Sequence, residues 1–330
     1  MKITIIGAGV AGLTVAAELN AQGHDVEVIA LSERIGEDAC SWFAGGMLAP
    51  WCEGESAPEQ IVRLGQQALD WWEHHVSGVE RRGTLVLSHT RDASELRRFS
   101  RRTSHHELID TPRIEELEPD LGNRFNQGLF FEHEGHLNPR RALLELAENL
   151  RQKGVRFQLG TDADTVKTDS DLTIDCRGLR AQDALSDLRG VKGEMLMIRS
   201  RDINLTRPVR LLHPRIPLYI VPRGDGVHMV GATMLETEAS PHISLRSTLE
   251  LLGAAYALHP AFAESEVLET GVDARPAFND NLPKIRRQGT KLYVNGFYRH
   301  GFLMSPALAK KVAEAVANPQ NMPELMEYSS

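Results

Sequence analysis

The spacing of apolar residues at the start of the chain predicts a strand, a helix and a second strand. Residues 3–6 form a short apolar run that ends at Gly7, which is typical of a buried parallel strand. Residues 10–22 repeat apolar positions with helical spacing, and Gly23 stands where the C-terminal cap of such a helix belongs. Residues 26–29 are a second apolar run. A strand–helix–strand unit of this kind is how a doubly wound α/β sheet begins.

Farther along the chain, predicted helices and strands alternate until the pattern becomes strand-rich. Between residues 193 and 231 apolar runs follow one another without a helix, which indicates a second sheet inserted into the first domain. The predicted fold class is therefore α/β (α+β), a Rossmann-type domain with an inserted, mostly antiparallel β-sheet domain. We assign residues 1–80, 132–192 and 268–330 to the first domain, and residues 81–131 and 193–267 to the second. The predicted helices are 59–76, 111–119, 139–153 and 244–258, the predicted strands are 84–88, 155–159, 172–176, 194–199, 218–221 and 227–230, and 31–58 is a long functional loop.

The composition of the chain argues against nucleic acid, a membrane or a metal ion as its partner. The chain has 330 residues and a formal net charge of −8, so it lacks the basic excess with which a nucleic-acid-binding protein neutralises phosphates. Its three cysteines include no CxxC pair, which fits a reducing cytoplasm. No apolar run reaches the length of about 18 residues that a membrane span needs, and the first residues do not resemble a signal peptide. Adjacent histidine pairs do not share a helix face, so we expect no metal site. We therefore expect a cytoplasmic protein that binds neither nucleic acid nor a membrane.

The first predicted strand and helix are joined by Gly7-Ala-Gly-Val-Ala-Gly12, the fingerprint of a dinucleotide-binding turn. Gly7 permits the tight turn, Gly9 lets the backbone approach a pyrophosphate, and Gly12 allows close packing of the helix on the strand. The N-terminus of the helix also offers unpaired N–H groups to the anion. The sequence therefore predicts that this turn binds a dinucleotide.

The acidic residue that usually follows the second strand of such a unit is displaced or absent. In the fingerprint this residue binds the ribose hydroxyls. Ala30 occupies the aligned position, and the next acidic residue is Glu33. Glu33 is our candidate for the ribose contact, and it is equally well a surface charge.

A second glycine-punctuated turn lies near the end of the chain. Residues 291–309 have the pattern of a short strand, a turn and the start of a helix. Arg299 stands in this turn, between Tyr298 and His300. A guanidinium held there by the backbone can grip a carboxylate with two parallel hydrogen bonds.

Several motifs, in the same order along nearly the whole chain, resemble the D-amino-acid oxidase family of FAD-dependent oxidoreductases. Within that family the chain is most similar to the glycine oxidases of thiamine biosynthesis. Besides the fingerprint, these motifs are the Gly-Gly-Met loop at 41–49, the segment 219–223, the Ala-Arg-Pro segment at 271–276 with Asp280 and Pro283 after it, and the Arg-His-Gly turn at 298–301. The fingerprint alone is unspecific, whereas the Gly-Gly-Met loop, the Ala-Arg-Pro segment and the Arg-His-Gly turn together are fairly specific.

The resemblance implies that FAD binds non-covalently at the fingerprint. The loop at 40–47 would line the flavin, the segment 299–305 would wrap its ring and ribityl chain, and the backbone of Val166 would contact the adenine. A surface loop with a packed tryptophan is the alternative for residues 41–49. From the fingerprint and the resemblance together, the residues expected to bind FAD are Gly7, Gly9, Val10, Ala11, Gly12, Glu33, Cys40, Ser41, Gly45, Gly46, Met47, Val166, Arg299, His300, Gly301, Phe302, Leu303, Met304 and Ser305.

The resemblance also places a substrate site beside the flavin. The carboxylate-binding arginine of the family falls on Arg275, a second substrate-side arginine falls on Arg299, and Tyr219 matches an active-site tyrosine. Met47 would border the same pocket. An amino-acid carboxylate in a water-poor pocket needs a partner that cannot lose its proton, which arginine provides. The alternatives are a buried ion pair for either arginine, for instance with Asp273 or Asp280, and a core position for Tyr219.

The function implied is a flavin-dependent amino-acid oxidase. It would convert glycine or another small amino acid to the imine and 2-oxo acid, reduce O₂ to H₂O₂, and serve thiamine thiazole biosynthesis. We name no acid–base residue, because the flavin carries the chemistry and the protein supplies orientation. The partners are then a small amino acid and O₂, and the family suggests a homo-oligomer. The alternatives are a sarcosine or D-amino-acid oxidase, a flavin dehydrogenase with another acceptor, an NAD-dependent reductase, and a flavoprotein without catalytic activity.

Overall fold

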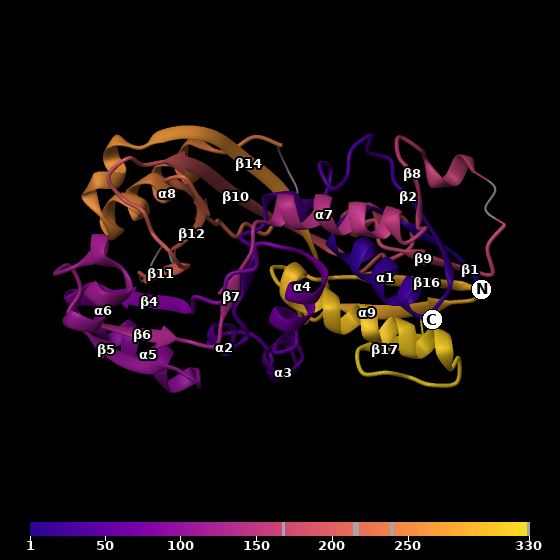
Figure 1. Cartoon of the computed structure of the whole chain (residues 1–330), viewed down its shortest axis with the longest axis horizontal. Helices are drawn as coiled ribbons and strands as arrows, with labels where there is room; N and C mark the ends of the chain where they lie inside the picture. The colour runs from indigo at the N-terminus through magenta and orange to yellow at the C-terminus, as the bar shows by residue number, and fades with distance from the viewer. Residues whose placement is uncertain (167–168, 214–217, 238–240, 329–330) are drawn as a thin grey trace.

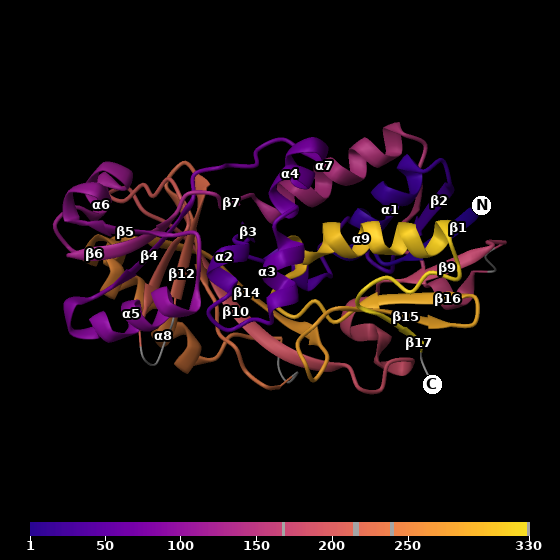
Figure 2. The same ribbon diagram turned by 90° about the horizontal axis from the view of Figure 1, so that it is seen from below.

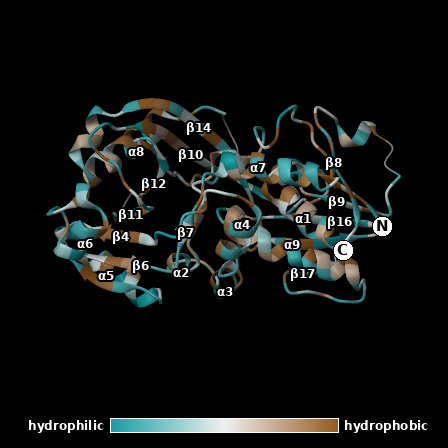
Figure 3. Ribbon diagram, viewed as in Figure 1, coloured by the Kyte–Doolittle hydropathy of each residue, from teal (hydrophilic) through white to brown (hydrophobic). Residues whose placement is uncertain are grey.

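The computed structural model describes residues 1–166, 169–213, 218–237 and 241–328, and two sheets dominate it. The sheets lie toward opposite ends of an elongated molecule, and both chain termini lie beside the first sheet (Figure 1). Each end has its own apolar core, and Figure 3 shows brown, apolar stretches in both halves. The described helices include none that is long and apolar enough to cross a membrane.

The first sheet confirms the predicted Rossmann-type architecture. Its strand order within the described residues is β17-β15-β16-β9-β1-β2-β8, and the five strands from β16 to β8 are parallel. β15 runs antiparallel to β16 and parallel to β17. The strands are β1 (Lys2–Ile6), β2 (Asp25–Ile29), β8 (Arg156–Gln158), β9 (Leu172–Asp175), β15 (Lys284–Gln288), β16 (Lys291–Asn295) and β17 (Met326–Tyr328).

Helix α1 (Val10–Ala21) is buried on nearly all sides because it packs both on this sheet and on α9 (Gly301–Ala317). Figure 2 shows α9 running alongside the sheet. A Cβ added to Gly12 would lie 1.9 Å from the carbonyl oxygen of Gly7, so only glycine allows this approach. Gly7 has a φ of +110°, which favours glycine for the turn. The other helices of this half are α2 (Pro50–Glu53), α3 (Glu59–Gly65), α4 (Ala68–His75) and α7 (Pro139–Gln152).

The second sheet has the order β14-β10-β13-β12-β11-β4-β6-β5 among the described residues. All its neighbouring strands are antiparallel except β11 and β4, which matches the mostly antiparallel sheet expected from the sequence. Helix α8 (Leu245–Leu258) packs on it. The strands are β4 (Thr84–Ser88), β5 (Glu107–Asp110), β6 (Gln127–Phe131), β10 (Arg189–Arg199), β11 (Val209–Leu212), β12 (Leu218–Gly224), β13 (Val227–Gly231) and β14 (Glu266–Ala277), and the other helices are α5 (Ala93–Arg102) and α6 (Thr111–Leu117).

Several elements differ from their predicted limits. The predicted helix 59–76 is two helices, α3 and α4, and the Gly65 at their junction packs tightly against Leu303. The predicted loop 31–58 contains η1 (Cys40–Phe43), α2 and β3 (Met47–Leu48), and β3 pairs with β7 (Gly135–His136). The domain limits at residues 192–193 and 267–268 fall inside β10 and β14, and the domain division stays a prediction. The remaining short helices are η2 (Thr90–Asp92), η3 (Pro119–Leu121), η4 (Ala163–Thr165), η5 (Gly178–Asp183) and η6 (Pro260–Glu264).

The contact between Gly12 and the Gly7 carbonyl generates a stability prediction. Gly12→Ala should lower the free energy of unfolding by at least about 2 kcal/mol, because the new methyl group meets backbone that cannot move away. Gly253→Ala is the matched control: Gly253 lies in α8 and a Cβ there meets nothing within 4 Å, so alanine should stabilise by about 0.5 to 1 kcal/mol. Urea unfolding of both variants measures the difference. Equal effects would contradict the proposed constraint at Gly12.

Candidate active site

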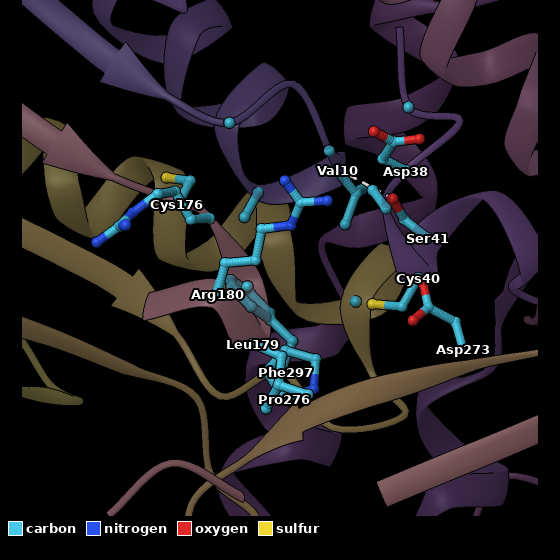
Figure 4. A pocket seen from close by; sticks show the side chains of 18 of the residues that line it. Val10, Asp38, Cys40, Ser41, Cys176, Leu179, Arg180, Asp273, Pro276 and Phe297 are labelled. Carbon is cyan, nitrogen blue, oxygen red and sulfur yellow. Dashed lines mark hydrogen bonds between the residues drawn. The ribbon is translucent and has the colours of Figure 1, made fainter. Parts of the chain in front are cut away.

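A cavity of about 670 Å³ brings together the fingerprint turn, the strand β14 and the start of α9. Figure 4 shows part of its wall, with Val10, Ser41 and Cys176 around it. Of the residues expected at the site, the wall contains Gly7, Gly9, Val10, Ala11, Cys40, Ser41, Gly45, Tyr219, Arg275, Arg299, Gly301 and Phe302. It does not contain Gly12, Glu33, Gly46, Met47, Val166, His300, Leu303, Met304 or Ser305, and the contacts expected of these residues stay predictions.

The end of the cavity at α1 fits an anionic dinucleotide. Gly9 is the N-cap of the helix, and no side chain caps it. The N–H of Val10 donates to Ser41 Oγ at 3.3 Å, which ties η1 to the end of the helix. A helix N-terminus whose N-cap residue is a glycine, at the wall of a cavity of this size, is suited to a pyrophosphate. The residues present therefore fit the group that the fingerprint predicts.

At the edge of the sheet the wall of the cavity includes Ala30 and the residues around Ser32. Glu33 is exposed and lies outside the wall, although its neighbours Ser32 and Arg34 belong to it. Asp162 and Asp164 also line the cavity, just after a segment whose N–H groups donate to the carbonyls of Ala30 and Ser32 at 2.9 Å. Val166 is half-buried and follows this segment. Both aspartates are additional candidates for contacts to a ribose, which the fingerprint alone did not indicate.

Arg275 lies on β14 with its guanidinium in the cavity wall. The guanidinium covers Gly193 of β10, because a Cβ added there would lie 2.2 Å from Nη2 and 2.3 Å from Cζ. Its Nη1 donates to the carbonyl of Thr233 at 3.1 Å. No ion pair between Arg275 and a carboxylate is present among the described residues. The pairings considered from the sequence are not formed: Asp273 accepts from the N–H of Ala274, and Asp280 pairs with Lys284.

Asp273 stands two residues before Arg275 and also lines the cavity. Figure 4 shows its carboxyl group beside Cys40. Burial raises its pKa, and the N–H of Ala274 and the charges of Arg180 and Arg275 oppose that rise. Burial also raises the pKa of the Cys40 thiol to about 12, with the charge of Asp273 adding to the effect. Cys40 is therefore a neutral thiol in the folded protein.

Arg299 reaches the same cavity but is already paired. Its Nη2 donates to Glu53 Oε2 at 2.6 Å and to Ser56 Oγ at 3.0 Å. Glu53 Oε1 accepts from Arg210 Nη2 at 2.5 Å. The alternative of a buried ion pair therefore holds for Arg299, with a partner that the sequence did not indicate.

Glu53 is a charged residue in the interior, 8% exposed. Burial would raise the pKa of its carboxyl group, but the positive charges of Arg299 and Arg210 outweigh burial and hold the pKa below the usual range. His300 Nδ1 lies 3.5 Å from Glu53 Oε2. Burial lowers the pKa of His300 to about 4, so this histidine is neutral at pH 7.

Tyr219 lies on β12 and its ring packs against Gly45, and both residues line the cavity, so Tyr219 is a wall residue as well as a packed aromatic. The loop carrying Gly45 is held by Arg223, whose Nη2 donates to the carbonyls of Ala44 and Gly45 at 3.1 and 2.8 Å. Burial lowers the pKa of Arg223 to about 9, which still leaves it charged at pH 7. Arg223 stands in the segment 219–223, and this motif was the only signal in the sequence that could have found it.

The carboxyl group of Glu134 supports the segment that carries Glu53. It is fully buried, and Oε1 accepts from the N–H of Cys52, the residue before Glu53, at 2.8 Å. Its Oε2 has no hydrogen-bond partner among the described residues. Burial raises the pKa of Glu134 from 4.5 to about 7.

Nearly the whole chain is similar to known proteins. Residues 2–315 match the family model described as "DAO: FAD dependent oxidoreductase". The putative thiamine biosynthesis oxidoreductase ThiO of Rhizobium etli is 51% identical over 98% of this chain and 99% of its own length. The glycine oxidase of Bacillus licheniformis is 25% identical over 96% of this chain and 93% of its own.

Two solved structures share the fold at lower identity. The glycine oxidase of Bacillus cereus superposes with a TM-score of 0.82 at 21% identity, covering 97% of this chain and 96% of that one. The iminodiacetate oxidase of Chelativorans sp. BNC1 has a TM-score of 0.81 at 20% identity and covers 99% of both chains.

The raised pKa of Glu134 generates a prediction about pH. Between pH 4.5 and about 7 the folded protein holds a proton on Glu134 that the unfolded chain has lost, so the free energy of unfolding falls as pH rises. This fall amounts to about 3 kcal/mol between pH 4.5 and pH 7, and Glu134→Gln should abolish it because glutamine does not titrate. Urea unfolding of wild type and variant from pH 5 to pH 8 measures it, with the exposed Glu132→Gln as control. A constant difference between wild type and Glu134→Gln across this range would contradict the interpretation.

Proposed function

This chain belongs to the DAO family of FAD-dependent oxidoreductases, and from that premise we propose that it oxidises glycine or another small amino acid with O₂ as the acceptor. The observation that carries the proposal is Arg275, a guanidinium without a carboxylate partner among the described residues, in the same cavity as the dinucleotide turn. Such a group binds a substrate carboxylate with two charge-assisted hydrogen bonds. FAD, when bound, supplies the hydride acceptor.

The size of the cavity supports a small substrate. Its volume of about 670 Å³ lies within the usual range of small-molecule sites. Because the same cavity would hold the dinucleotide as well, only part of this volume is open to the amino acid. Tyr219 and the loop at Gly45 bound the remainder. The similarity to the ThiO protein of Rhizobium etli supports a role in thiamine biosynthesis.

The contribution of the protein chain to catalysis is orientation. Arg275 is fixed by its contact with Gly193 and by the hydrogen bond to Thr233, so a bound carboxylate has one position. Fixing the carboxylate of a small amino acid restricts how the rest of the molecule can lie in the cavity. We assign no side chain as a general base.

The direct test is anaerobic reduction of the purified holoenzyme. We expect glycine, and more weakly sarcosine or D-alanine, to bleach the absorbance of the bound FAD. Air should then restore the colour and produce H₂O₂ in equal amount. Bleaching that air reverses only slowly would point to a dehydrogenase with another acceptor. No bleaching by any small amino acid would contradict the proposed function.

The role of Arg275 generates a second prediction. Arg275→Ala should raise KM for glycine by about 100-fold, because a charge-assisted pair with a carboxylate is worth a few kcal/mol. Arg275→Lys keeps the positive charge but cannot make two parallel hydrogen bonds to a carboxylate. Its KM for glycine should lie between those of the wild type and Arg275→Ala. Arg201→Ala, which removes an exposed arginine with a side-chain exposure of 85%, is the control. Steady-state kinetics at equal FAD content measures this, and an unchanged KM in Arg275→Ala would show that Arg275 has a structural role only.

A further inference from the structure

Two arginines reach one cavity in different electrostatic states. Among the described residues Arg275 donates to the neutral carbonyl of Thr233 and pairs with no carboxylate, whereas Arg299 is bound to the carboxylate of Glu53. Both side chains belong to the wall of the same space. The difference between them comes from one residue, Glu53, which lies behind the wall rather than in it.

Glu53 is held in place from two sides. Arg210 binds one carboxylate oxygen and Arg299 binds the other, so the carboxylate cannot turn away without breaking a buried ion pair. The partner of Arg210 is Glu53, whose Oε1 accepts from Nη2 at 2.5 Å. His300 is neutral at pH 7 and adds no charge to the group. The negative charge of Glu53 is therefore permanent, and it acts on Arg299.

Arg299 has already committed its Nη2 donors. Its Nη2 donates both to Glu53 and to Ser56, and its Nη1 lies 3.8 Å from the sulfur of Met234. A second carboxylate arriving at Arg299 would have to bind through Nε and Nη1, and would meet the negative charge of Glu53 on the other side of the guanidinium. Arg275 pairs with no such carboxylate among the described residues.

We propose that Glu53 is a specificity-determining residue, which pairs with Arg299 and thereby makes the enzyme prefer amino acids with one carboxylate over those with two. The inference rests on the proposed function and names its substrate class. Glu53 acts through Arg299, so it is a positioning residue. An iminodiacetate oxidase with this fold exists, so the fold alone does not exclude a dicarboxylate amine, and the selection has to come from side chains.

Sarcosine and iminodiacetate are the matched substrates for the test, because they differ at nitrogen by a methyl against a carboxymethyl group. In the wild-type holoenzyme, kcat/KM for iminodiacetate should be at least about tenfold below that for sarcosine, since its second carboxylate finds no free guanidinium. This arm needs no variant. Comparable values for the two substrates would overturn the proposal.

Variants of Glu53 and Arg299 test whether these two residues cause the preference. Glu53→Gln should shift the ratio of the two kcat/KM values toward iminodiacetate by about tenfold, mainly through KM for iminodiacetate, because Arg299 is released. Glu53→Asp keeps the charge and should keep the wild-type preference. The double variant Glu53→Gln with Arg299→Gln should lose the gain, as expected if the two residues act as one unit. A gain that persists without Arg299, or an unchanged ratio in a folded Glu53→Gln with full FAD content, would overturn the proposal.

Ligand binding separates this inference from the proposed function. Acetate and malonate are not oxidised, and their Kd values follow from the change that they cause in the absorbance of the bound FAD. The wild type should bind malonate no more tightly than acetate, and Glu53→Gln should tighten malonate selectively by about tenfold. If no amino acid reduces the flavin, the proposed function fails while this binding comparison still decides the role of Glu53. Equal changes for both ligands would contradict it.

Discussion

The pairing of β10 with β14 is the constraint on which the site depends. The two strands are hydrogen-bonded from Arg189 opposite Ala277 to Arg199 opposite Glu266, with one irregularity. This ladder sets Gly193 beside the guanidinium of Arg275 and aims that guanidinium into the cavity whose other wall is the turn before α1. A shift of one residue would turn Arg275 to the other face of the sheet. The position of the carboxylate site is thus decided by strand register rather than by a flexible loop.

The two arginines at the cavity differ in whether a carboxylate pairs with them. Arg275 donates to the carbonyl of Thr233 and lies over Gly193, which has no side chain to accept a hydrogen bond. Its other N–H groups can therefore bind a ligand. Arg299 forms an ion pair with Glu53. The arginines on both sides of Glu53 lower the pKa of its carboxyl group, so it stays negatively charged. Two arginines at one cavity therefore differ in function because Glu53 pairs with only one of them.

The parts that could be predicted from the sequence are those set by local pattern. The fingerprint, α1 and the parallel strands follow from the spacing of glycines and apolar residues over a few turns, and all are present. The length of β10 could not be predicted, because Lys192 and Glu194 interrupt the apolar pattern and their burial is satisfied by an ion pair with each other. The break between α3 and α4 depends on the contact of Gly65 with Leu303, which is distant in sequence.

The same limit applies to the site. Arg275 was expected at the cavity from the resemblance and lies there. Glu53 could not be found, because its partners Arg210 and Arg299 are 157 and 246 residues away along the chain. Nothing in the local sequence around Glu53 distinguishes it from a surface glutamate.

The most direct measurement is a crystal structure of the holoenzyme with glycolate, which carries the carboxylate of glycine but not its amine. The account predicts that both carboxylate oxygens lie within hydrogen-bonding distance of Arg275, while Arg299 stays paired with Glu53. A carboxylate bound at Arg299 instead, with Arg275 turned to a protein carboxylate, would contradict it.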